Sequence, residues 1–214
     1  MQTNANGTAI VVALVAIAGL YFTLAKAVAP AAARPSKAGA ALVEFAADGQ
    51  LKQPVGYRQW VYIGTPLTPN ELNDGHANFP EFHAVYIDPE SFAYWKKTGK
   101  FRDGTVIVKD LLSVGSKKAA SGNGYFMGDY TGMEVAIKDS KRFKDEPGSW
   151  AYFDFGSKPP LKEEVSKKPT AACNACHQSF AKTDWVFTQY YPVLRAAARL
   201  RRSEAYPGGS QHAV

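Results

Sequence analysis

The segment FHAVYIDPES, residues 82–91, places a strand directly before a helix and so indicates the class of fold. Residues 82–87 are mostly β-branched or aromatic, which favours a strand. Asp88 then suits a helix N-cap, Pro89 suits the first helical position, and an acid follows in the first turn. We therefore predict a strand at 82–87 and a helix that ends at Gly99.

Further strand-like segments lie on both sides of this unit. They are rich in β-branched and aromatic residues, and they cover residues 59–66, 105–113 and 150–155, with more extended chain at 125–138. A last helix is predicted at 192–202, where a proline occupies the first turn. The sum predicts an α+β fold, with a mainly antiparallel β-sheet, packed helices and a helical C-terminal segment.

The two cysteines of the chain both lie in CNACH, residues 173–177. This is C-x-x-C-H, the attachment motif of a c-type haem, in which the thiols bond the haem and the histidine becomes an axial iron ligand. A thioredoxin-type dithiol would need a βαβ context, a structural zinc four ligands, and a disulfide across so short a loop would stabilise little. We therefore predict one covalent haem c on Cys173 and Cys176, with His177 as the iron ligand.

The length of 214 residues and a hydrophobic content of 46% suit one domain with extensions. Residues 8–24 form an uncharged apolar run. Two interpretations stay open, because the run resembles a secretory signal peptide but also reaches the lower limit of a membrane anchor. Both imply export. We predict a signal peptide or anchor plus a Pro/Ala-rich linker at 1–37, the haem domain at 38–202 and a flexible tail at 203–214.

The formal net charge of +6 is spread along the chain, with a basic cluster at 195–202. No nucleic-acid-binding motif accompanies this cluster, so we expect no nucleic-acid partner. We interpret it as a solvated helix face that could meet an acidic partner or membrane lipid.

Two charged residues lie among apolar neighbours. Lys109 shares a strand face with Ile107 and Leu111, where burial would cost several kcal/mol unless the lysine is paired or chemically changed. The ordinary explanation is an edge strand, on which inward lysines prevent aggregation. Glu134 is either a solvent-facing residue or a general base beside the haem.

These residues lie in segments that resemble the cytochrome P-460 family of small periplasmic haem proteins. The likeness spans roughly residues 43–197, and its longer segments are far more specific than C-x-x-C-H alone. The matching segments are residues 69–75, 87–111, 122–136, 173–177 and 181–197.

The resemblance implies a homodimer whose iron has an open distal side and oxidises hydroxylamine to nitrous oxide or more oxidised nitrogen products. It implies that electrons pass to an external acceptor such as another cytochrome. Lys109 matches a lysine that is bonded to a meso carbon of the porphyrin, and Glu134 matches a distal carboxylate. Cys173 and Cys176 match the thioether cysteines, and His177 matches the proximal ligand.

A related group, cytochrome c′-beta, shares the fold, lacks the bonded lysine and binds nitric oxide without turnover. The presence of Lys109 therefore favours the enzyme over a nitric-oxide-binding or electron-transfer cytochrome. His83 stands where family members often carry arginine. It is either a surface exchange or a contact with the haem edge.

Overall fold

The computed structural model describes residues 42–205. The apolar run at 8–24 and the chain from residue 206 lie outside these residues, so export and the outer domain limits stay predictions. Between residues 42 and 205, none of the helices combines the length and the apolar character that crossing a bilayer requires.

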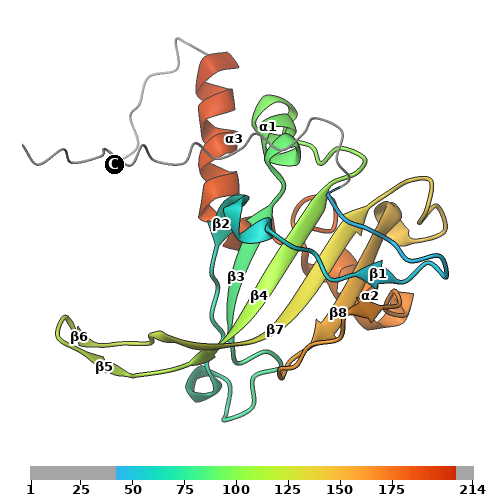
Figure 1. Ribbon diagram of the computed structural model, residues 1–214. Helices are drawn as coiled ribbons and strands as arrows, with labels where there is room; N and C mark the ends of the chain where they lie inside the picture. The colour runs from blue at the N-terminus through green and yellow to red at the C-terminus, as the bar shows by residue number, and fades with distance from the viewer. Residues whose placement is uncertain (1–41, 206–214) are drawn as a thin grey trace, which may run out of the picture. The chain divides into compact units, whose positions relative to one another are not determined.

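The domain is built on a five-stranded antiparallel sheet (Figure 1), and the predicted α+β fold is confirmed. The predicted strand at 82–87 is found with the same limits, and the extended chain at 125–138 is one long strand. In spatial order the strands are β2 (Val61–Gly64), β3 (Phe82–Ile87), β4 (Val106–Val114), β7 (Met127–Lys138) and β8 (Trp150–Gly156).

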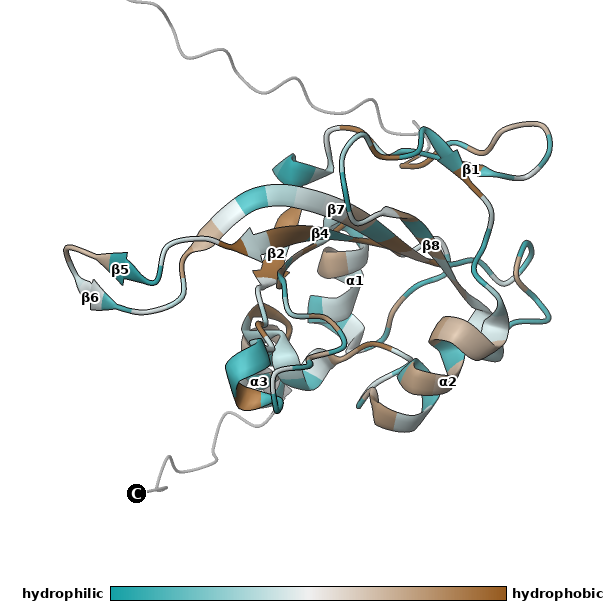
Figure 2. Ribbon diagram, turned by 90° about the horizontal axis from the view of Figure 1, so that it is seen from below, coloured by the Kyte–Doolittle hydropathy of each residue, from teal (hydrophilic) through white to brown (hydrophobic). Residues whose placement is uncertain are grey.

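Helices cover one face of the sheet and the N-terminal part of the domain covers the other (Figure 2). The helices are α1 (Pro89–Thr98), α2 (Thr170–Phe180) and α3 (Pro192–Ala205). On the opposite face, β1 (Leu51–Lys52) pairs with β9 (Glu164–Val165). Because successive strand residues alternate in direction, Ile107 packs with the helices whereas Val106 and Val108 belong to the other core.

Several short elements were not predicted. The hairpin of β5 (Lys118–Ala119) and β6 (Gly122–Asn123) projects beyond the end of the sheet (Figure 1). Within residues 42–205, four short 3₁₀ helices lie at Tyr57–Gln59, Asn70–Leu72, Pro147–Ser149 and Thr188–Tyr190.

The predicted N-cap of α1 also joins this helix to the sheet. Asp88 is fully buried, and its carboxylate accepts hydrogen bonds from the backbone N–H groups of Ser91, at 2.8 Å, and Val106, at 2.9 Å. Arg102 approaches the same carboxylate at 3.3 Å. A buried carboxylate with several donors is stabilising in place and costly to disrupt, so Asp88 fixes where α1 begins relative to β4.

We expect Asp88→Ala to lower the free energy of unfolding by about 3 kcal/mol, because it leaves two buried N–H groups and Arg102 without their acceptor. Denaturant unfolding of the haem-loaded protein measures this loss. Asp88→Asn is the matched control, since it keeps one capping oxygen and is expected to lose less. A loss below about 1 kcal/mol for the alanine variant would contradict the assignment, because that is no more than a typical exposed cap contributes.

Candidate functional site

Helix α2 presents the C-x-x-C-H residues on one side. Cys173, Cys176 and His177 are spaced i, i+3 and i+4, and residues at these spacings share a helix face. Both thiols are free, with Cys173 half-buried and Cys176 exposed. Asn174 is buried and donates a hydrogen bond to the carbonyl of Trp150 at 3.1 Å. This bond fixes the helix against strand β8.

The imidazole of His177 has a defined orientation. Its Nδ1 donates to the backbone carbonyl of Trp185 at 2.7 Å, which leaves Nε2 as the nitrogen with a free lone pair. The rings of Tyr152 and Phe187 lie with their centroids 4.3 and 4.7 Å from the imidazole. Burial lowers the pKa of His177 and so favours the neutral form, which is the form that binds a metal.

Lys109 and Glu134 are direct cross-strand partners on β4 and β7, and their side chains form an ion pair. Strand β4 is the third of the five strands, so the edge-strand explanation of Lys109 is wrong. The pair lies on the face that the helices cover. Lys109 is two residues after Ile107 of the helical core, and residues two apart on a strand point to the same face. The side chains are 22% and 31% exposed, so both reach an accessible part of this face.

The charges of Lys109 and Glu134 shift the pKa values of Cys173 and His177 on helix α2. Beyond the effect of burial, Lys109 lowers and Glu134 raises the pKa of His177. Burial raises the pKa of the Cys173 thiol, Glu134 raises it further, and Lys109 opposes that rise. The geometry agrees, because Glu134 shares its strand face with Ala136, and the cross-strand partner of Ala136, Tyr152, packs its ring against His177 of α2. The structure thus brings the predicted site residues together between β4, β7 and α2.

His83 lies beside Lys109 and not on an open surface. Its Nε2 is buried and has no hydrogen-bond partner among residues 42–205. Burial and the positive charge of Lys109 lower the pKa of His83 to about 3, which keeps the ring neutral. The ring centroid of Phe79 lies 6.0 Å from the ring centroid of His83. The same centroid lies 5.2 Å from the Nζ atom of Lys109. His83 and Phe79 therefore adjoin the site, although the sequence assigned His83 no definite role and did not single out Phe79.

The aromatic residues around His177 were also missed as site residues. Tyr152 was predicted only as part of a strand, and Trp185 and Phe187 only as part of a family-like segment. Tyr191 belongs with them, because it packs against the same core cluster as Tyr152 and Trp185, and burial raises its pKa. The density of aromatic residues at 150–155 and 185–191 is the one signal that could have identified them.

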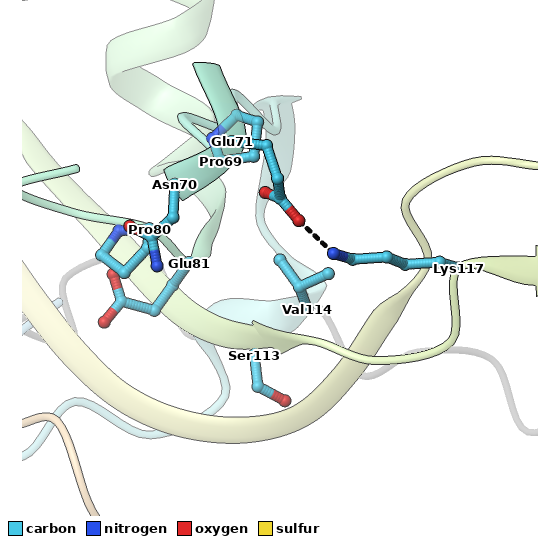
Figure 3. Close-up of a pocket in the computed structure, with 8 residues that line it drawn as sticks. All are labelled: Pro69, Asn70, Glu71, Pro80, Glu81, Ser113, Val114 and Lys117. Carbon is cyan, nitrogen blue, oxygen red and sulfur yellow. Dashed lines mark hydrogen bonds and ion pairs between the residues drawn. The ribbon is translucent and has the colours of Figure 1, made fainter. Parts of the chain in front are cut away.

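The chemistry of these donors fits a haem. Two free thiols and an imidazole with an available Nε2 share one helix face, as haem c requires. A pocket of about 340 Å³ at the far end of β4 is separate from this set (Figure 3). It is lined by residues 69–71, 80–81, 113–114 and 117, and is crossed by the ion pair of Glu71 with Lys117.

Comparison with known proteins agrees with this donor set. No curated protein matches the chain. A profile of the family described as cytochrome P460 matches residues 54–188, which include β2 to β8, helix α2 and the segment that holds His177. The match covers more than half of the chain and includes Lys109, Glu134, Cys173, Cys176 and His177. The chain therefore belongs to the cytochrome P460 family and is a haem cytochrome.

Proposed function

We propose that the protein is an exported c-type haem enzyme that oxidises hydroxylamine to nitrous oxide or other nitrogen oxides. The observation that carries the proposal is the cross-strand pair of Lys109 and Glu134 on the face that also holds His177. A haem protein that only carries electrons has no need for a lysine and a carboxylate at this position. Such a pair suits chemistry in which protons are moved.

Cys173 and Cys176 would hold the haem through thioether bonds, and His177 would ligate the iron through Nε2. The hydrogen bond to Trp185 and the two flanking rings orient His177 for this purpose. When bound, the haem would supply an iron site for hydroxylamine and would take up the electrons of its oxidation.

Lys109 would be bonded through its side-chain nitrogen to the porphyrin. Its position supports this role, because Lys109 lies on the middle strand of the sheet and its side chain reaches the accessible part of the face that the helices cover. Loss of the ammonium charge on bonding would release Glu134 from its ion pair. Glu134 would then be free to accept a proton from hydroxylamine as the electrons leave.

The remaining features of the proposal concern the setting of the enzyme. We expect a periplasmic homodimer, processed at a signal peptide or tethered to the inner membrane by residues 8–24. Electrons would pass to a soluble or membrane-bound acceptor such as another cytochrome. The alternative is a cytochrome that binds nitric oxide or carries electrons without turnover.

Intact mass and visible absorption of the purified protein distinguish the enzyme from this alternative. We expect a haem-bearing peptide that contains both the 173–177 motif and Lys109, together with a Soret band of the reduced protein that is shifted to the red. An ordinary c-type spectrum, with Lys109 recovered in an unmodified peptide, would instead identify a carrier or gas-binding cytochrome.

A further inference from the structure

A second cavity, of about 540 Å³, lies between α1, α3 and residues 182–189, and its lining is strongly basic. Four cationic side chains on it are exposed, and we call them the arginine face: Lys182, Arg195, Arg199 and Arg202. Within the described part of the chain none of the four lies within ion-pair distance of an acid, and no acidic residue lines the cavity. The positive charge of this surface is therefore not neutralised by those residues.

The shape of the arginine face suits a broad partner. Arg195, Arg199 and Arg202 are spaced i, i+4 and i+7 along α3, so they line up on one side of the helix over about 10 Å. Arg201 differs from them, because its guanidinium donates to the carbonyl of Trp95 at 2.9 Å and so closes the end of α1. A stripe of separated cations complements a negatively charged surface better than a single small anion.

One segment of the chain, residues 183–189, both lines this cavity and contacts His177. Thr183, Thr188 and Gln189 line the cavity from the same segment whose Trp185 carbonyl and Phe187 ring hold the imidazole. The hydroxyl groups of Thr183 and Thr188 lie 3.0 Å apart and brace the segment internally. One side of a short segment thus contacts the predicted iron ligand, and the other side forms part of the arginine face.

We propose that the arginine face is the docking site of an acidic redox protein that exchanges electrons with the haem. In each encounter the partner's oxidised centre would accept one electron from the reduced haem, so that the partner is reduced and the haem oxidised by one electron. No bond to the partner forms. Proximity to the ligand segment favours a redox protein over a lipid surface, because electron transfer benefits from a short path to His177 and lipid binding does not.

This inference rests on the haem placement in the proposed function, but not on hydroxylamine as substrate. The test uses the haem-loaded protein, reduced beforehand and mixed in a stopped-flow instrument with oxidised plastocyanin, an acidic blue-copper protein. The variant is Lys182→Glu with Arg199→Glu and Arg202→Glu, since no side-chain hydrogen bond or ion pair within the described residues involves these three. Arg195 is kept because it donates to the carbonyl of Gln189.

We expect the second-order rate of electron transfer to fall at least about tenfold at low ionic strength, and the difference to shrink as salt screens the charges. Calorimetric titration with plastocyanin is expected to show a matching loss of affinity. The matched control is Lys118→Glu with Lys141→Glu and Lys158→Glu, which makes the same change in net charge at exposed lysines elsewhere.

An equal fall in rate for both triple variants would mean that only net charge matters, and would overturn the docking site. So would an unchanged rate in the arginine-face variant. If that variant instead loses binding to phosphatidylglycerol vesicles and keeps its electron-transfer rate, the face meets a membrane and the proposal is wrong. A protein that exchanges electrons as expected but does not oxidise hydroxylamine would refute the proposed function and leave the docking site standing.

Discussion

Lys109→Arg is expected to abolish the oxidation of hydroxylamine while leaving the haem attached. Arginine keeps the positive charge opposite Glu134, so the cross-strand ion pair and the fold are preserved. Its guanidinium stays protonated at every accessible pH and cannot provide the amine nitrogen that a bond to the porphyrin needs. We expect turnover to fall at least about 100-fold, equivalent to ~2.7 kcal/mol in the barrier.

Three measurements on the Lys109→Arg protein test this prediction: turnover, the Soret band of the reduced form, and the mass of the haem-bearing peptide. The spectrum should become that of an ordinary c-type cytochrome. Lys138→Arg is the matched control, because Lys138 also lies on a central strand and forms an ion pair, with Asp184 at 2.8 Å. Wild-type turnover in the Lys109 variant would refute the role of the lysine.

Glu134→Gln is expected to slow turnover by roughly 10²- to 10⁴-fold, the range over which a positioned general base contributes. Glutamine retains the shape and hydrogen-bonding capacity of the side chain but cannot accept a proton. Hydroxylamine binding, followed by spectral titration of the ferric protein, should change little. The loss should therefore fall on kcat and not on KM.

Asp154→Asn provides the control for Glu134, because Asp154 is the cross-strand partner of Glu134 on β8 and also carries a carboxylate. Its removal takes away a negative charge from the same row of the sheet without touching the proposed base. Similar slowing in both variants would show that the local charge matters and proton acceptance does not. Glu134→Asp should recover part of the rate, since a carboxylate returns at a shorter reach.

Much of the fold follows from local patterns in the sequence. The strand at 82–87 and the start of α1 at Pro89 were predicted correctly because β-branched residues, an Asp cap and an N1 proline act over a few residues. The alternation of β4 also predicted correctly that Lys109 shares a face with Ile107. These features depend on neighbours in sequence and need no knowledge of distant contacts.

Strand order could not be obtained in this way. The position of β4 in the middle of the sheet depends on its pairing with both β3 and β7, and that pairing is set by distant parts of the chain. The edge-strand explanation of Lys109 failed for this reason. The environments of His177 and His83 were equally out of reach, because Tyr152, Trp185 and Phe79 meet them only after folding.

The acceptor for the His177 Nδ1 hydrogen is a peptide carbonyl and not a side chain. Its presence depends on the path of the main chain at Trp185, where φ is +58°, and not on the chemistry of the Trp185 side chain. A substitution of Trp185 that keeps this backbone conformation would therefore change the polarity around the imidazole and leave the acceptor of the Nδ1 hydrogen, and with it the orientation of His177, in place.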